Sequence, residues 1–138
     1  MALILDTGPI LAALDADDAD HAACRRLLLN TTEVLLIPAP VLVEADYWLT
    51  RRVHHLAFAS LLRDIDDGGF AVEPLEMADY RRARELVERF ADARVGFVDA
   101  AVLAVVERLG EPKLATLDRR HFGLLRPRHV DSLLLLPD

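Results

Sequence analysis

The sequence predicts an α/β protein in which helices cover both faces of a central parallel β-sheet. Short apolar runs alternate along the chain with longer segments of helical periodicity. Most of the short runs are apolar throughout, which is typical of parallel strands that are buried on both faces. The composition agrees, because 53% hydrophobic residues with only 6% aromatic residues indicate an aliphatic core.

The first half of the chain begins with a strand and a helix. Residues 2–5 are apolar and lead into Asp-Thr-Gly-Pro, a sequence suited to the start of a helix that continues to about residue 15. A second helix is expected at 18–29, with acids at its start and arginines near its end, as the helix dipole favours. A buried strand at 34–37 then leads through two prolines into a helix at 41–49, which closes on an arginine pair.

The second half repeats this alternation. Helical periodicity at 54–65 ends at Asp-Asp-Gly-Gly, and the helix at 77–93 is the most charged. The helix at 95–109 is apolar almost all round and stops at a glycine, so we expect it to be largely buried. The other expected elements are strands at 70–72, 113–117 and 133–136, and a turn or short helix at 118–122.

Length and cysteine content predict one cytoplasmic domain that spans residues 1–138. A chain of 138 residues and 15.4 kDa can bury most of its apolar surface without disulfides or a structural metal. Cys24 is the only cysteine, which suits a reducing compartment. We expect no signal peptide, because Asp6 follows only four apolar residues at the N-terminus, and no membrane segment, because the apolar run at 133–136 is far too short to span a bilayer.

The net charge of −7 argues against a protein that binds nucleic acid nonspecifically, because phosphate affinity comes mostly from Lys and Arg. Almost all the basic residues are arginines, however, which bind phosphate through two hydrogen bonds at once. Several of them form pairs, although each pair also fits an ordinary solvated helix face. The pairs are Arg25-Arg26, Arg51-Arg52, Arg81-Arg82 and Arg119-Arg120.

Four separated acidic residues are candidates for one site. Asp6 and Asp118 each follow a predicted strand, and parallel sheets bind ligands beyond the carboxyl ends of their strands. Asp99 lies within the apolar helix, and Glu44 has apolar residues on both sides. Each acid alone also fits a helix cap or a helix surface, but a buried carboxylate is costly unless a cation neutralises it.

These carboxylates predict a site for Mg²⁺ or Mn²⁺. Like charges about 4 Å apart repel by roughly 4 kcal/mol at an effective dielectric near 20, and a divalent cation removes that penalty. Carboxylate and water oxygens suit these hard ions, whereas zinc normally recruits His or Cys. Such ions catalyse hydrolysis of phosphodiesters by activating water and stabilising charge on the phosphate. The hydroxyls of Thr7 and Thr116 are expected to support the carboxylates, although threonine also occurs in strands and caps for structural reasons.

Four segments, in order along the chain, resemble a known family. They are Asp6-Thr7-Gly8, Glu44, Asp99-Ala100-Ala101 and Thr116-Leu117-Asp118-Arg119-Arg120-His121-Phe122. Together they resemble the PIN domain and, more narrowly, the VapC-type toxins of bacterial toxin–antitoxin pairs. The similarity runs nearly end to end, and the late Thr-x-Asp followed by Phe is its most specific part.

The resemblance implies a PIN-like three-layer sandwich and an Mg²⁺- or Mn²⁺-dependent endoribonuclease. It further implies a homodimer that acts on RNA and is inhibited by a cognate antitoxin. The implied catalytic and metal-binding residues are Asp6, Glu44, Asp99 and Asp118. Arg119 and Arg120, beside Asp118, are the leading candidates for RNA contact. His121 stands where many relatives have an acid, which puts a fifth acidic ligand in doubt.

Two other functions remain open on the sequence alone. A PIN-like module that binds protein or RNA without effective catalysis would not need the complete set of acids. A housekeeping RNA-processing nuclease would keep the acids and lack an antitoxin. Nucleotide-binding enzymes fit poorly, because the chain has neither a glycine-rich phosphate loop nor a dinucleotide fingerprint.

Overall fold

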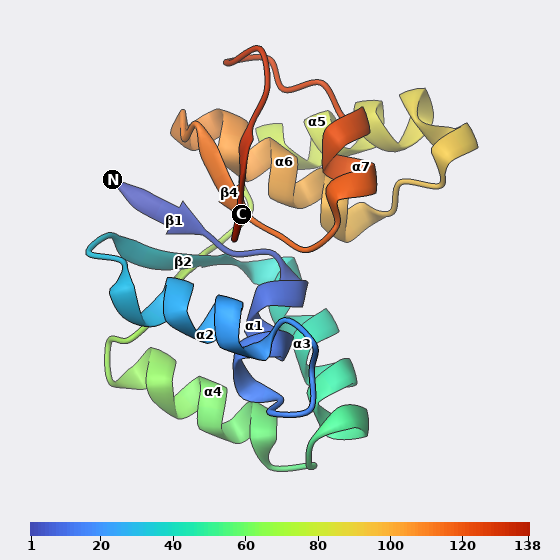
Figure 1. The fold of residues 1–138 in the computed structure, drawn as a ribbon. Coiled ribbons are helices and arrows are strands. Elements are labelled where there is room, and N and C mark those ends of the chain that lie inside the picture. Colours follow the sequence, from blue (N-terminus) through green and yellow to red (C-terminus); the bar gives the residue numbers. More distant parts are fainter.

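The computed structural model describes residues 1–138 as alternating strands and helices (Figure 1). Every strand and helix expected from the sequence is present, with shifted ends. The strands are β1 (Ala2–Ile4), β2 (Val34–Pro38), β3 (Ala71–Glu73), β4 (Lys113–Ala115) and β5 (Leu134–Leu136). The helices are α1 (Thr7–Leu14), α2 (His21–Asn30), α3 (Ala39–Arg52), α4 (Ala57–Asp66), α5 (Met77–Arg89), the 3-10 helix η1 (Ala91–Ala93), α6 (Phe97–Leu109) and α7 (Arg119–Leu124).

All strand pairs are parallel, as the apolar runs predicted. One sheet has the order β1-β2-β3, and β4 pairs with β5 in a second, two-stranded sheet. A parallel bridge between Leu5 and Ala115 joins the two sheets just beyond β1. There the Leu5 amide donates to the Leu36 carbonyl and the Asp6 amide to the Ala115 carbonyl, both at 2.9 Å. The joined order is therefore β3-β2-β1-β4-β5, with β1 in the centre.

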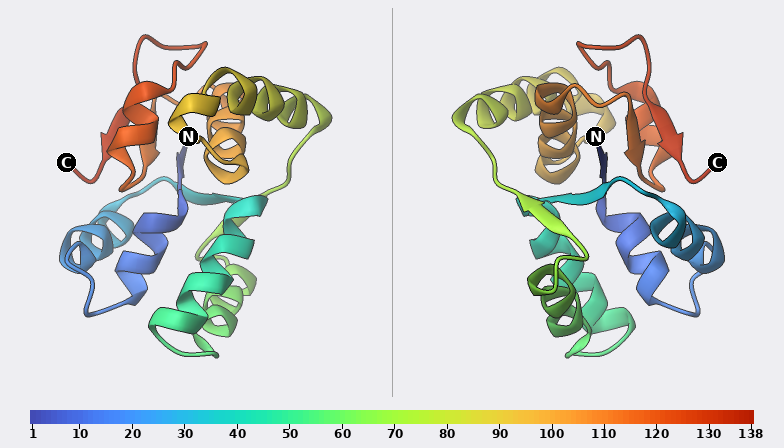
Figure 2. Two further views of the ribbon diagram at one scale, coloured as in Figure 1. Left: turned by 90° about the vertical axis from the view of Figure 1, so that its right-hand side faces the viewer. Right: turned by 90° about the vertical axis from the view of Figure 1, so that its left-hand side faces the viewer.

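The helices form a layer on each side of the strands, which confirms the three-layer arrangement (Figures 1 and 2). Helices α1 to α4 lie on one side, and α5 and α6 lie on the other. Helix α6 is the most buried helix, since every residue from Ala100 to Val106 is buried. This explains its apolar sequence, because burial of each large aliphatic side chain contributes roughly 1.5–3 kcal/mol.

Two predicted helices are shorter in the structure, for local reasons. The helix expected from Asp18 begins only at His21, because the Asp18 side chain accepts a hydrogen bond from the Asp20 amide at 2.8 Å. Such side-chain turns compete with helical hydrogen bonds. The helix expected at 77–93 ends at Arg89 and continues as η1, after which Arg94 adopts a left-handed conformation with φ of 56°. This reversal brings Val95 into the core.

The strand order reverses at β1, because later strands are added on both sides of it. From β1 the chain adds β2 and β3 on one side, and β4 and β5 lie on the other. In open parallel sheets, the crevice at such a point, beyond the carboxyl ends of the strands, is where ligands bind. The residues that follow β1 and β4 therefore occupy the position expected for a site.

None of the helices has the combination of length and apolar character that crossing a membrane requires.

Candidate metal centre

The four predicted acids line one open cavity of about 410 Å³. Asp6 follows the central strand β1, and Asp118 caps α7 just beyond β4. Asp99 lies in the first turn of α6, and Glu44 lies in the middle of α3. The structure thus brings together side chains from four elements that are far apart in the sequence. The cavity is lined by Asp6, Thr7, Gly8, Leu11, Glu44, Trp48, Asp99, Leu117 and Asp118.

Asp6 is the most buried of the four acids, with only 5% of its surface exposed. The Thr116 hydroxyl donates to its Oδ2 at 2.8 Å, whereas its Oδ1 is buried without any hydrogen-bond partner. Burial is the main reason why the pKa of Asp6 rises from 3.8 to about 7. The Thr116 hydrogen bond opposes the rise, and the charges of Asp99 and Glu44 add to it. A buried oxygen without a partner is a ready ligand for a cation.

Asp99 couples the two ends of the cavity. Burial raises the pKa of Asp99, and the charge of Asp118 raises it further. His121 lowers the pKa of Asp99, and Glu44 contributes to its rise. The charges of Glu44, Asp118 and His121 therefore all act on the Asp99 carboxylate. A cation placed among these groups would relieve the repulsion that their electrostatic coupling reflects.

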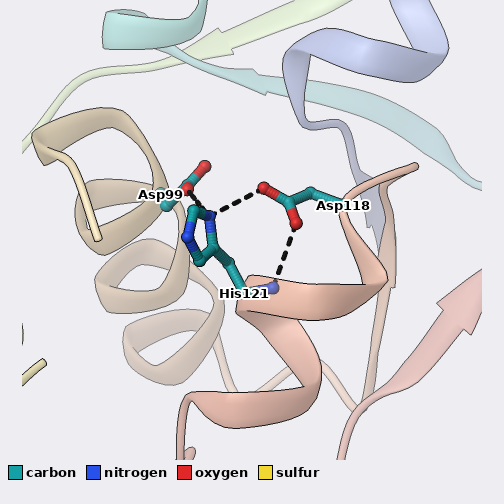
Figure 3. A group of neighbouring side chains, drawn as sticks. All are labelled: Asp99, Asp118 and His121. Carbon is teal, nitrogen blue, oxygen red and sulfur yellow. Dashed lines mark hydrogen bonds and ion pairs between the residues drawn. The ribbon is translucent and has the colours of Figure 1, made fainter. Parts of the chain in front are cut away.

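His121 lies among the acids, as Figure 3 shows. Its Nδ1 is 3.0 Å from Asp99 Oδ2 and 2.9 Å from Asp118 Oδ2. Burial opposes the charged imidazolium, but the Ala93 carbonyl and Asp118 raise the pKa of His121 above its ordinary value. In the sequence, this position stands out only because many relatives have an acid there. The available signal was its spacing, because residues three apart on a helix lie on one face.

The two threonines expected to support the acids differ in their contacts. Thr116 donates to Asp6, and its oxygen accepts a hydrogen bond from the Asp118 amide at 3.0 Å, so it links the two strand ends. The Thr7 hydroxyl lies on the cavity wall but is buried without a hydrogen-bond partner. Thr116 therefore bonds to both Asp6 and Asp118, whereas Thr7 Oγ1 forms no hydrogen bond with any of the carboxylates.

Gly8 allows α1 to pack closely against the loop that carries Asp118. A Cβ at this position would lie 3.2 Å from the Leu117 Cβ, which is tighter than most real contacts. A larger residue would push α1 and this loop apart. Gly8 therefore helps to keep the residues beyond β1 and β4 close enough to line the same cavity.

Basic and aromatic side chains lie around the acids. Arg119 and Arg120 are exposed in the first turn of α7, directly after Asp118, and the Arg119 guanidinium donates to the Pro137 carbonyl. Trp48, the only tryptophan, lines the cavity one helical turn after Glu44 and is 42% exposed. It packs edge-on against the Tyr47 ring at 5.1 Å.

The apolar run after Glu44 divides between core and surface. Leu49 is fully buried and Phe58 is half-buried. The other large residues of the run are exposed. They are Tyr47, Trp48, Val53 and Leu56.

The donor set fits a hard divalent cation. All four cavity acids offer carboxylate oxygens, and one of these oxygens is buried without a partner. Mg²⁺ and Mn²⁺ prefer such oxygen donors, together with water, in a cavity that stays open to solvent. The fit rests on Asp6, Glu44, Asp99 and Asp118.

Known proteins resemble this chain over nearly its whole length. The sequence pattern of the PIN domain matches residues 3–125. Ribonuclease VapC26 of Mycobacterium tuberculosis is 34% identical over 125 residues, which cover 91% of this chain and 93% of that protein. The crystal structure of Mycobacterium tuberculosis VapC20, a sarcin-ricin loop cleaving toxin, superposes with a TM-score of 0.81 at 25% identity, covering 94% of this chain and 99% of that one.

A more distant structure has the same fold. VapBC2 from Rickettsia felis, bound to a DNA fragment from its promoter, superposes with a TM-score of 0.69 at 18% identity. The match covers 98% of this chain and 97% of that one.

Replacing Asp6 with Asn is expected to stabilise the metal-free protein at high pH. A carboxyl whose pKa is higher in the folded state binds more protons when folded, so the charged form destabilises the fold increasingly as pH rises from 3.8 to about 7. This shift corresponds to roughly 4 kcal/mol. In EDTA at pH 8, Asp6→Asn should melt roughly 5 °C or more above the native chain, and the difference should shrink towards pH 4.

The matched control for this experiment is Asp131→Asn, which changes an exposed acid outside the cavity. Its melting temperature should follow that of the native protein at both pH values. If calorimetry finds Asp6→Asn no more stable than this control at pH 8, then the charge on the Asp6 carboxylate does not destabilise the fold. Added Mn²⁺ should stabilise the native chain more than Asp6→Asn.

Proposed function

This chain belongs to the PIN domain family, and from that membership we propose that it is an Mg²⁺- or Mn²⁺-dependent endoribonuclease that acts as the toxin of a toxin–antitoxin pair. The single observation that carries the proposal is the cavity lined by four carboxylates, one of which, Asp6, has a buried oxygen without a hydrogen-bond partner. The relative named as a ribonuclease covers 91% of the chain. The continuous apolar core supports treating residues 1–138 as one PIN-like domain.

In this proposal the four acids, Asp6, Glu44, Asp99 and Asp118, hold the cation and are the catalytic residues. A bound divalent cation supplies an activated water and stabilises negative charge on the phosphate during attack. The chain positions the ligands: Thr116 fixes Asp6 through its hydroxyl and holds the loop of Asp118 through the Asp118 amide. Asp6 follows the buried strand β1 and Asp99 lies on the buried helix α6, so packing of the core sets the positions of both carboxylates.

The surroundings of the acids suit single-stranded RNA. Arg119 and Arg120 provide positive charge beside Asp118, where an RNA phosphate would approach the cation. The Trp48 ring, which lines the same cavity and is 42% exposed, offers a face on which an unpaired base can stack. Local arginines and one aromatic ring thus offset the acidic net charge of −7.

The metal-free protein should not cut RNA, and Mn²⁺ or Mg²⁺ should restore cleavage. Asp99→Asn should lower the cleavage rate by at least about 100-fold, because it removes a central ligand while keeping the shape of the side chain. The measurement is the rate at which a labelled single-stranded RNA is cut. The control variant Asp131→Asn should cut it at the native rate. Activity that persists in EDTA would contradict metal dependence, and a fully active Asp99→Asn would contradict the site.

Replacing both Arg119 and Arg120 with Ala should weaken RNA affinity by about 10-fold and reduce its dependence on salt. The pair Arg81-Arg82 is a poor control, because Arg82 is bound to Glu107 at 2.8 Å and supports the fold. Arg25 and Arg26 are both exposed on α2 and provide the matched double variant. Binding of a fluorescent RNA in EDTA separates affinity from cleavage, and equal effects of the two double variants would refute this placement.

We further propose a homodimer that is inhibited by a cognate antitoxin in the cytoplasm, where an RNA-cleaving toxin meets its substrates. Exposed apolar residues support an interface. Leu14, Val53 and Leu56 line a surface hollow of about 330 Å³ between α1 and α4, and such patches commonly mark protein contacts. Burial of apolar area there would favour association by roughly 25 cal/mol per Å² before association costs.

Light scattering of the isolated chain should give the mass of a dimer. Co-expression with the adjacent reading frame should yield a complex in which RNA cleavage is suppressed. Leu56→Asp, which places a charge in the exposed hollow, should weaken that complex. A monomer that ignores the neighbouring product and cuts RNA in its presence would instead identify a housekeeping nuclease.

A further inference from the structure

We propose that His121 Nδ1 is a direct ligand of the cation, shared with Asp99 and Asp118, and that this nitrogen shifts the metal preference from Mg²⁺ towards Mn²⁺. The inference rests on the proposed metal-dependent function and names one more residue of that site. It assigns a nitrogen donor to the position at which many relatives have an acid.

The geometry of the three side chains suits a shared cation (Figure 3). One donor atom from each of Asp99, Asp118 and His121 lies within 4.8 Å of the others, and all three residues are half-buried. His121 Nδ1 is 3.0 Å and 2.9 Å from the two carboxylate oxygens. Adjacent ligands of an octahedral ion with bonds of about 2.1 Å are about 3.0 Å apart, so the spacing already matches neighbouring coordination positions.

The other ring nitrogen determines what Nδ1 can offer. His121 Nε2 is 3.1 Å from the Ala93 carbonyl oxygen, which can only accept a hydrogen bond. Nε2 therefore carries a hydrogen. In the metal-free chain Nδ1 also donates, to Asp99 and Asp118, so a cation bound at this point would replace the Nδ1 proton and accept the lone pair that is directed at the two carboxylates. Metal-binding histidines characteristically donate their second ring N–H to a carbonyl or carboxylate in this way.

Backbone contacts from two separate segments hold the ring in place. Ala93 belongs to η1, between α5 and α6, whereas His121 lies in α7. The His121 amide also donates to Asp118 Oδ1 at 3.0 Å, which fixes the carboxylate relative to the ring. The carboxylate and the imidazole are therefore arranged before any ion binds, which lowers the ordering cost of binding.

A nitrogen ligand changes which ion is favoured. Mg²⁺ prefers oxygen donors and retains several waters, whereas imidazole binds the first-row transition ions more strongly. His121→Asp provides an oxygen donor at the same position and should move the preference back towards Mg²⁺. His121→Ala should remove the ligand without replacement. His55, an exposed histidine in the turn between α3 and α4, provides the matched control His55→Ala.

Calorimetric titration of the metal-free chain with Mn²⁺ and with Mg²⁺ tests the preference. His121→Ala should weaken Mn²⁺ binding by about 10- to 100-fold and Mg²⁺ binding much less. His121→Asp should lower the ratio of Mn²⁺ to Mg²⁺ affinity, and His55→Ala should leave both affinities unchanged. Pulsed EPR of the Mn²⁺-loaded protein should detect a directly bonded nitrogen in the native chain and in His55→Ala, but not in His121→Asp.

The outcomes separate this inference from the function on which it rests. If Mn²⁺ binds with native affinity to His121→Ala, or if EPR finds no bonded nitrogen in the native chain, then His121 is only a charged neighbour of the acids. In that case the inference is wrong and the metal-dependent ribonuclease remains. If neither ion binds the native chain, the proposed function itself is wrong.

Discussion

The burial of carboxylates beside one another in a single cavity, where their charges also repel, is the constraint on which the site depends. Asp6 is buried at the end of the central strand, with one oxygen unpartnered, and Asp99 and Glu44 add their charges to the same space. The sheet and α6 hold these groups in place although their charged forms oppose folding. The chain keeps a locally unfavourable arrangement that a divalent cation converts into a favourable one.

The fold meets this constraint by placing each acid on a different rigid element. The change of direction at β1 brings the ends of β1 and β4 together, and Thr116 bonds to the residues that follow both. Helix α6 is buried along its middle and carries Asp99 in the helix layer that lies across the strands from α1 to α4. The apolar core therefore stabilises the protein and also sets the position of the charges.

Much of this arrangement follows from the sequence. Apolar runs without alternation predict the parallel sheet, and an acid directly after each of two strands predicts the place of the site. The sequence does not indicate His121 as a ligand, because the orientation of its ring depends on a contact with the Ala93 carbonyl. Ala93 directly precedes the left-handed residue Arg94. Contacts between distant segments, such as Ala93 with His121, have no periodic signal in the sequence. The same holds for the hydroxyl of Thr7, whose lack of a partner only the packing reveals.

Anomalous X-ray scattering from crystals soaked in Mn²⁺, recorded at the manganese absorption edge, tests most directly whether the four carboxylates hold a cation. We expect an anomalous peak within bonding distance of Asp99 and at least one other of the four cavity acids. Crystals of Asp99→Asn, soaked in the same way, should show a weaker peak or none. A well-occupied peak elsewhere on the chain, with none in the cavity at saturating Mn²⁺, would contradict the claim that these carboxylates converge to hold a cation.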